Sequence, residues 1–478
     1  MRFIGNAPVD GEVRAIASGA LATGDTVVVN ADGTVSVVAG SNSSSGSPVV
    51  FNSATTTMQP SSSVYDSSNN KIVIAYKDYG NSQYGAAIVG TISGSTITFG
   101  SSTVFESASI EHQTITFDDN SNKVVIAYRD GGAGKAIVGT VSGTSISFGS
   151  STTFESSGIE GVGMTFDTTN NKVVISYADL TSSSNGTAVV GTVSGTSISF
   201  GTPAVFEGGR TDYTSAAFDS SNNKVVISYS DKDNSNYGTA VVATVSGTSI
   251  SFGSVAVYTS EYAIYNAIVF DSSVNKVVIS YRAATDGDKG KSVVGTVSGT
   301  SISFGSAVTF ASGGAGIVSA TYDTSLNKVL VAYSDKGNSN YGTIALGSVS
   351  GTSISFASGG VFESAAADDI NITYDANANK SAVFYYDEGN SFYGTASVFT
   401  AGSTNLTSEN FVGFANSGYA DGQSAAINST CMVDSNQTSL TAGQTYYVQT
   451  SGALGTTPAD PSVVAGTAIS SNSIIVKG

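Results

Sequence analysis

The feature that most constrains this sequence is an internal repeat of about 50 residues. An Asn-Lys pair followed by an apolar run occurs seven times. Its lysines stand at positions 71, 123, 172, 224, 276, 328 and 380, so the spacings are 52, 49, 52, 52, 52 and 52 residues. A second marker, Thr140–Phe148 (TVSGTSISF), recurs almost unchanged in later units. Such regular self-similarity is typical of architectures in which each repeat packs only against its neighbours.

Each repeat reads as four strands rich in Val, Ile, Tyr and Phe, separated by turn residues. In the second repeat the predicted strands are Thr114–Asp118, Lys123–Asp130, Lys135–Ser142 and Thr144 to about Phe154. In Lys123–Asp130 the lysine is followed by the apolar run Val124–Tyr128, which is typical of a strand buried on both faces. Four strands per unit of this length predict an all-β fold, a seven-bladed β-propeller over residues 47–410. A solenoid of stacked sheets is the competing architecture.

The start of the repeat region favours a closed ring over a solenoid. Pro48–Ala54 (PVVFNSA) copies the end of a fourth strand, Thr103–Ala108 (TVFESA). The seventh repeat lacks that segment after Ser397–Ala401. We therefore expect the beginning of the region to complete the last blade, because closure removes two exposed sheet edges.

The two ends of the chain predict one small β domain. Residues 1–40 contain a hairpin with a turn at Asp32-Gly33, and residues 411–478 contain strand-like segments such as Gln444–Gln449 and Ser473–Lys477. Neither end alone buries much core, but together they form a viable domain. We predict a composite anchoring domain from residues 1–40 and 411–478, with the propeller inserted in it. Ala39–Ser47 (AGSNSSSGS) reads as a flexible linker.

Composition narrows the classes of function. The net charge of −17 disfavours nucleic acid and anionic membranes as partners. One cysteine excludes an internal disulfide framework, and one histidine excludes most zinc sites. Apolar runs are only strand-length, and the first residues lack the apolar stretch of a signal peptide. We therefore predict no cofactor, no metal, no membrane insertion and no classical export.

Comparison of the repeats with one another locates a candidate binding surface. Loops between first and second strands are nearly uniform, as in Asp66–Lys71 and Asp219–Lys224, which both read DSSNNK. Loops at the opposite face vary, which predicts a surface for a carbohydrate or protein, with free drift as the alternative. Tyrosine rings stack on sugars, and carboxylates accept hydrogen bonds from hydroxyls. The candidate binding residues are Glu111, His112, Arg210, Asp212, Tyr213, Glu261, Tyr262, Tyr265, Asp368 and Asp369.

Catalysis and calcium binding are the less favoured readings of the acidic residues. A glycan-degrading propeller needs a pair of carboxylates, which these loops could supply, but no catalytic motif accompanies them. The segments Asp78–Gly85 and Asp335–Gly342 resemble the Asp-box turns of sialidases, in which the Asp is structural. Each such loop has one or two carboxylates, whereas calcium needs six or more oxygen ligands. We predict a non-enzymatic protein without catalytic residues.

Motifs at both ends carry a resemblance to a known family. Gly24–Val35 (GDTVVVNADGTV), Phe411–Ala415 (FVGFA), Leu440–Val448 (LTAGQTYYV) and Val464–Ser470 (VAGTAIS) resemble a small β domain of tailed-phage virion proteins, which include capsid-decoration proteins and tail fibres. The repeats resemble those in structural proteins of marine phages that infect cyanobacteria. The resemblance implies a homo-oligomer, with a trimer favoured, on the virion surface.

The resemblance and the two-faced repeats together predict a tail-fibre or spike component. The end domain contacts other virion proteins, and the propeller presents its variable face to a glycan or protein of the host surface. A capsid-decoration protein with an architectural role is the alternative.

Overall fold

The computed structural model describes residues 11–57, 62–459 and 461–477. The chain divides into two compact units. The ring unit is Ser44–Thr400, and the end unit consists of the described parts of Met1–Ser43 and Ala401–Gly478. Regular structure in the described residues is β-strand, with four short 3-10 turns. None of the described helices is long and apolar enough to cross a membrane.

The strands of the ring unit fall into sets according to their place in the repeat. The second strands are β8 (Lys71–Asp78), β12 (Lys123–Asp130), β17 (Lys172–Asp179), β21 (Lys224–Asp231), β25 (Lys276–Ala283), β30 (Lys328–Asp335) and β33 (Lys380–Asp387). The third strands are β9 (Tyr84–Ser93), β13 (Ala133–Ser142), β18 (Asn185–Ser194), β22 (Tyr237–Ser246), β26 (Lys289–Ser298), β31 (Tyr341–Ser350) and β34 (Tyr393–Thr400). Short strands follow most of the third strands: β10 (Thr96–Phe99), β14 (Ser145–Phe148), β15 (Thr152–Glu155), β19 (Ser197–Phe200), β23 (Ser249–Phe252), β27 (Ser301–Phe304) and β28 (Val308–Ala311).

The innermost strands are of two kinds. Three of them are separate: β7 (Ser63–Asp66), β16 (Ile159–Asp167) and β29 (Ala315–Asp323). Four are the second halves of long strands: β11 (Thr103–Asp118), β20 (Ala204–Asp219), β24 (Ala256–Asp271) and β32 (Ser353–Asp375). The first part of β11 pairs with β9 of one repeat, and Ile110–Asp118 pairs with β12 of the next. A long strand therefore links two consecutive sheets.

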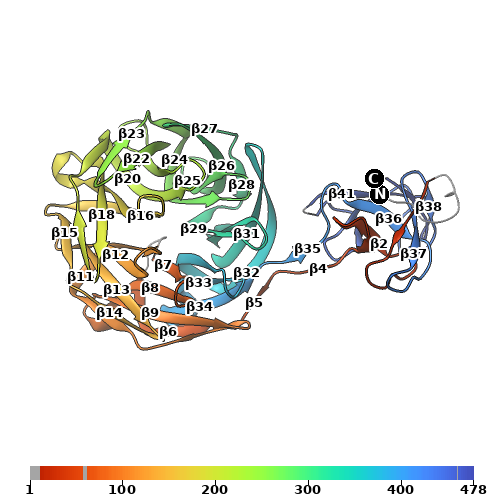
Figure 1. Cartoon of the computed structure of the whole chain (residues 1–478), viewed down its shortest axis with the longest axis horizontal. Coiled ribbons are helices and arrows are strands. Elements are labelled where there is room, and N and C mark those ends of the chain that lie inside the picture. Colours follow the sequence, from red (N-terminus) through yellow and green to blue (C-terminus); the bar gives the residue numbers. More distant parts are fainter. Residues whose placement is uncertain (1–10, 58–61, 460, 478) are drawn as a thin grey trace. The chain divides into compact units, whose positions relative to one another are not determined.

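The second repeat shows the antiparallel pairing within one sheet. From the centre outward, β11 pairs with β12, β12 with β13, and β13 with both β14 and β15. The same order recurs from repeat to repeat, and the sheets follow one another around a ring (Figure 1). The predicted strand Lys123–Asp130 is confirmed at both ends.

Two predicted strands of this repeat have other bounds. The first strand begins at Thr103 rather than at Thr114, because β11 continues from the preceding sheet. The predicted fourth strand is split into β14 and β15. The split follows Gly149, where a Cβ atom would clash with the carbonyl oxygen of Thr196 in the neighbouring repeat. The chain therefore needs glycine where it leaves the sheet edge.

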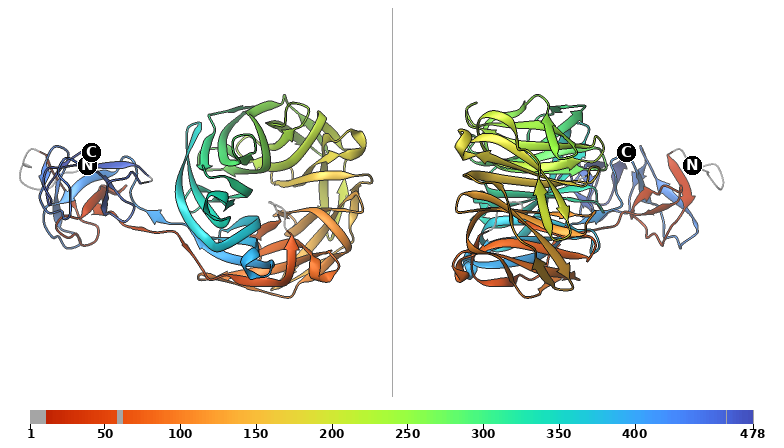
Figure 2. Two further views of the ribbon diagram at one scale, coloured as in Figure 1. Left: turned by 180° about the vertical axis from the view of Figure 1, so that it is seen from behind. Right: turned by 60° about the vertical axis from the view of Figure 1, so that its left-hand side comes forward.

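The first strand of the ring unit pairs with its last. In β6 (Val49–Thr57), Val49 lies opposite Ala396 and Val50 opposite Thr395 of β34. The two segments lie side by side at the bottom of the ring in Figure 1 and again in Figure 2. The expected pairing of the chain's beginning with the last repeat is therefore present. The segment predicted as a flexible linker is instead partly paired, since β4 (Gly40–Ser41) pairs with β35 (Ser403–Thr404) and β5 (Ser44–Ser45) with β34.

Packing between sheets rests on second strands and aromatic clusters. Val124–Tyr128 are fully buried, as predicted for a strand covered on both faces. Phe105 of β11 packs against Tyr128 and Phe148 of the following sheet, with ring centroids 5.2 and 5.7 Å away. At the closure of the ring, Phe51 packs in the same way against Tyr76 and Phe99, and its ring centroid lies 5.4 and 5.6 Å from theirs. Aromatic rings thus fix the contact between sheets at the closure as they do elsewhere.

The uniform turns have a structural cause. The carboxylate of Asp219 accepts hydrogen bonds from the backbone N–H groups of Ser221 and Asn222, both at 3.0 Å. The Asn222 side chain donates to the other carboxylate oxygen at 2.9 Å. Asp219 is almost fully buried, so these bonds satisfy a group that would otherwise be costly to bury. The motif therefore repeats for folding reasons.

Besides the short pair β4–β35, the described part of the end unit contains two five-stranded sheets. One has the order β1 (Glu12–Ile16), β37 (Ser424–Asn428), β36 (Phe411–Ala415), β2 (Thr26–Val29), β3 (Val35–Val37). The other has the order β38 (Val433–Asp434), β42 (Ile474–Val476), β41 (Val463–Ala468), β39 (Thr445–Val448), β40 (Leu454–Gly455). The predicted hairpin is confirmed by the pairing of β2 with β3. Strands from both ends of the chain thus share the first sheet.

Candidate functional site

Most of the innermost strands have a β-bulge near the end that faces the turns between second and third strands. In β11 the register shifts between Glu111 and Thr114. The same shift occurs in β16, β20, β24 and β32. In each of these strands one bulge residue has φ between 48° and 56°: His112, Gly161, Tyr213, Tyr265 and Asp369. A bulge turns a side chain away from the regular strand pattern, so this device sets the direction of these residues.

Four of these bulge residues are not glycine, so their conformation has a cost. Positive φ brings Cβ close to the backbone carbonyl, at about 1–2 kcal/mol per residue. Such strain persists only where the surrounding structure enforces it, and it is frequent at binding sites. The bulges therefore mark the end of the ring unit at which the candidate site lies.

Asp212 and Asn266 hold the bulge of Tyr213 in place. The Asp212 carboxylate accepts a hydrogen bond from the Tyr213 backbone N–H at 2.9 Å and an ion pair from Lys232 at 2.8 Å. The Asn266 side chain donates to the Tyr213 carbonyl oxygen at 3.2 Å and accepts from the Tyr258 hydroxyl at 3.1 Å. Asp212 therefore positions Tyr213.

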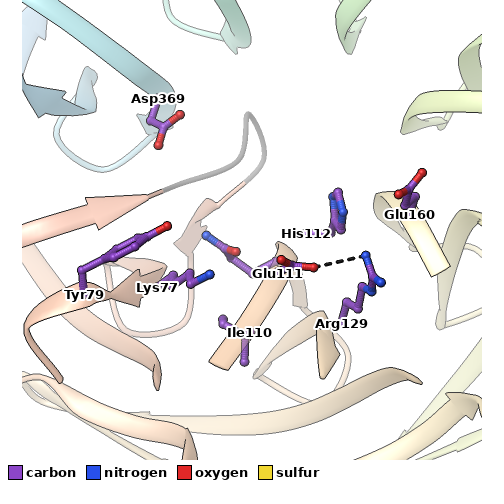
Figure 3. A pocket seen from close by; sticks show the side chains of 9 residues that line it. Lys77, Tyr79, Ile110, Glu111, His112, Arg129, Glu160 and Asp369 are labelled. Carbon is purple, nitrogen blue, oxygen red and sulfur yellow. Dashed lines mark ion pairs between the residues drawn. The ribbon is translucent and has the colours of Figure 1, made fainter. Parts of the chain in front are cut away.

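A cavity of about 440 Å³ lies beside His112 (Figure 3). Glu111 and Arg129 form an ion pair of 3.1 Å at its edge. His112 and Glu160 stand next to each other, and Asp369 faces them from the other side (Figure 3). The lining consists of Lys77, Tyr79, Ile110, Glu111, His112, Gln113, Arg129, Glu160 and Asp369. The cavity thus combines hydrogen-bonding groups of both charges with one exposed aromatic ring.

A second cavity, of about 270 Å³, lies beside Tyr265. Its lining contains Arg282, Lys336, Asp368 and Glu388. Arg282 and Lys336 both bind Asp288, at 2.7 and 2.8 Å. Tyr265 also packs edge-on against Tyr213, with ring centroids 5.3 Å apart.

Burial shifts the pKa values of several side chains here. Burial lowers the pKa of His112, against the opposing effect of Glu160 and Glu111, so the neutral imidazole is favoured. Burial also raises the pKa of the Asp368 carboxyl and those of the Tyr213 and Tyr265 hydroxyls. Both tyrosines therefore keep their protons and remain hydrogen-bond donors at neutral pH.

The structure sorts the ten predicted site residues into two groups. Glu111, His112 and Asp369 line the first cavity, and Tyr265 and Asp368 line the second. Tyr213 and Asp212 lie at the bulge of the intervening strand. All seven lie within strands, so the prediction that they belong to loops was wrong. Their place in bulges explains why they vary without disturbing the turns.

The other three predicted residues line neither of the two cavities in the described structure. Arg210 is exposed and lies opposite Asn185 in the outer part of β20. Glu261 pairs with Lys291, and Tyr262 lies opposite Tyr237. These residues occupy the part of each long strand that still belongs to the preceding sheet.

Sequence reasoning missed the cationic side chains of the site. Lys77, Arg129 and Arg282 share one repeat position, between a buried tyrosine and the last residue of the second strand. Tyr386 occupies the same position in the last repeat. This position varies while the residues before it hardly change, and that contrast was the available signal.

The turns that resemble Asp-boxes are structural here. Asp78 and Asp335 each accept a hydrogen bond at 3.0 Å from the backbone N–H two residues on, in Gly80 and Gly337. These contacts begin the 3-10 turns η1 (Tyr79–Asn81) and η3 (Lys336–Asn338). Among the described residues, no group of three or more His, Cys, Asp or Glu side chains is placed to hold a metal ion.

Comparison with solved structures identifies the type of fold. BP39L lectin from Burkholderia pseudomallei matches with a TM-score of 0.53 and 11% identity, over 74% of this chain and 99% of that one. Sqt1 from Chaetomium thermophilum matches with a TM-score of 0.45 and 11% identity, over 72% and 84%. A triple mutant of AofleA from Arthrobotrys oligospora matches with a TM-score of 0.41 and 7% identity, over 69% and 92%. No protein-family model and no curated protein sequence matches this chain. The likeness to BP39L shows an all-β, propeller-like fold.

Proposed function

We propose that this chain is a non-enzymatic carbohydrate-binding protein of a phage virion surface. In this proposal the ring unit is a seven-bladed propeller that binds a host glycan at the bulge end. The end unit attaches it to other virion proteins, as in a tail fibre or spike, and the assembly is a homo-oligomer, with a trimer favoured.

The blade number is supported by the strand pairing. Each of seven innermost strands, or halves of long strands, pairs with its own second strand: β7, β11, β16, β20, β24, β29 and β32. The pairing of β6 with β34 supports a ring in which the beginning of the region completes the last blade. The sharing of one sheet by both chain ends supports an insertion of the ring into the end unit.

The observation that carries the binding proposal is the chemistry gathered by the bulges. His112, Tyr213, Tyr265 and Asp369 share the same bulge conformation. His112 and Asp369 line a cavity of about 440 Å³, and Tyr265, against which Tyr213 packs, lines one of about 270 Å³. Sugars present apolar ring faces and many hydroxyls, which suit aromatic rings next to carboxylates. The match to a protein named as a lectin agrees with this reading.

The virion part of the proposal rests on the resemblance of the terminal motifs. Its runner-up is a capsid-decoration protein whose variable face has no ligand. The net charge of −17 fits either role, because it keeps a repetitive β protein soluble.

The test is binding of the full chain to a glycan array and to marine cyanobacterial cells. We expect binding to both, and loss of both when Tyr265→Ala and His112→Ala are combined. Absence of glycan and cell binding would favour the decoration protein, which cryo-EM of a particle would then locate on the capsid. Release of reducing ends from the bound polysaccharide would instead identify an enzyme.

A further inference from the structure

Both arginines that line the two cavities are neutralised by carboxylates. Glu111 binds a terminal nitrogen of Arg129 at 3.1 Å. Asp288 binds Arg282 through Nε and a terminal nitrogen, both at 2.7 Å. A guanidinium is the group that proteins use to grip a carboxylate, sulfate or phosphate, because its donors match the two oxygens of the anion. Here Arg282 directs two of its donors at Asp288 and Arg129 directs one at Glu111, so each charge already faces an acid of the protein itself.

The lysines near the cavities are engaged in the same way. Lys336 binds the second oxygen of Asp288 at 2.8 Å. Lys232 binds Asp212 at 2.8 Å. Lys77 is buried, with its ammonium 5.2 Å from the centre of the Tyr79 ring. No cationic side chain that lines either cavity is therefore left without a carboxylate or aromatic partner within the described part of the chain.

Several carboxylates of the cavities, by contrast, have no cation bound to them. Glu160 in the first cavity, and Asp368 and Glu388 in the second, make no ion pair with any described residue. With Asp288 counted, three carboxylates face two cations in each cavity. Ionised carboxylates only accept hydrogen bonds, so they favour ligands that donate them.

Building on the proposed function, we infer that the cavities select sugars without an acidic group. Hydroxyl and amino groups donate to Glu160, Asp368 and Glu388, while the Tyr265 ring, against which Tyr213 packs, supplies apolar contact in the second cavity. A uronate, sialic acid or sulfated sugar would bring an anion to acceptors of its own sign and would have to displace Glu111 or Asp288. The ion pairs of Glu111 and Asp288 are thus specificity determinants of the site.

The first experiment is an array on which neutral oligosaccharides stand beside their amino, uronate, sialylated and sulfated counterparts, probed with the full chain. We expect binding to neutral or amino members and at least tenfold weaker binding to each acidic counterpart. Equal or tighter binding to an acidic member overturns the inference and leaves glycan binding intact. Binding to no member at all overturns the proposed function, and the inference with it.

Two substitutions sharpen the test by removing the internal partners of the arginines. Glu111→Gln releases Arg129, and Asp288→Asn releases Arg282 and Lys336. Glu111 is about half exposed, and Asp288 has φ 61°, which asparagine tolerates, so both variants should fold. We expect each to gain at least tenfold in binding to the acidic members.

Glu409→Gln in the end unit is the matched control, since it makes the same change in charge at an exposed position far from the site in sequence. It should leave the array pattern unchanged. Failure of both Glu111→Gln and Asp288→Asn to increase acidic binding, in variants with unchanged melting temperature, contradicts the assignment of these two residues. An equal gain in Glu409→Gln would attribute the effect to net charge and would also contradict it.

Discussion

Tyr213 and Tyr265 lie edge to face, with ring centroids 5.3 Å apart and ring planes at 66°. They belong to neighbouring repeats and occupy the same bulge position, with φ of 50° and 54°. An edge-on pair of this kind is more favourable than its buried area alone by about 0.5–1.5 kcal/mol. The two backbones are thus held in a costly conformation that brings two aromatic rings together beside a cavity.

This relationship predicts that Tyr265 is required for glycan binding. We expect Tyr265→Ala to weaken binding of the best glycan about tenfold or more. The substitution removes the Tyr265 ring, which contacts the sugar in this proposal, and it also removes the ring against which Tyr213 packs. Tyr265→Phe, which keeps the ring, should retain most of the affinity. Tyr322→Ala, at the uniform turns, is the control and should bind normally. Calorimetric titration measures the affinities, and unchanged binding by Tyr265→Ala contradicts the placement of the site.

Sequence patterns predicted the regular part of the fold because burial dictates it. Val124–Tyr128 are apolar since neighbouring sheets cover both faces of β12, and the strand has the predicted bounds. The duplication of Thr103–Ala108 in Pro48–Ala54 likewise predicted the pairing of β6 with β34. In both cases the structural requirement determines which residue types occur at these positions, so the sequence reveals it.

The bulges could not be predicted in that way. His112, Tyr213 and Asp369 share a backbone conformation without sharing a residue type. The shift in register is imposed by the neighbouring strand and by groups such as Asn266, far away in sequence. Variation at these positions therefore predicts variable loops, and it gives no sign of the neighbouring cation, such as Arg129 opposite Glu111.

Closure of the ring predicts a large role for Phe51. The centroid of its ring lies 5.4, 5.6 and 6.4 Å from those of Tyr76, Phe99 and Phe384. Phe51 stands on β6, which pairs with β34 of the last sheet and, at its end, with β8 of the first. We expect Phe51→Ala to lower the free energy of unfolding by about 3 kcal/mol. Val50→Ala, on the same strand but 40% exposed, should change it by less than about 0.5 kcal/mol. Denaturant unfolding measures both, and equal effects would argue against closure through this strand.

The positive φ of His112 predicts an unusual order of stabilities. His112→Gly and His112→Ala both remove the imidazole, so their difference reports the backbone alone. We expect the glycine variant to be more stable by about 1 kcal/mol, since glycine has no Cβ to clash. At Ser109, an extended and exposed position of the same strand, the order should reverse, with glycine less stable by roughly 0.5–1 kcal/mol. The same order at both positions would show that residue 112 is not strained.

Burial of His112 predicts a specific dependence of stability on pH. Burial lowers the pKa of its imidazole, although Glu160, Glu111 and Asp212 oppose the shift and Arg129 adds to it. The unfolded chain then binds this proton more readily than the folded chain, so stability falls as pH decreases through the ordinary histidine pKa of 6.5. His112→Gln lacks this contribution, whereas all carboxylates contribute alike in both proteins. Between pH 7.5 and 5 the melting temperature of the natural chain should therefore drop more than that of the variant.

Because His112 is the only histidine, a proton NMR titration of its ring gives the folded pKa directly. A value at or above 6.5 would show that burial does not outweigh the neighbouring carboxylates and would remove the basis of this prediction.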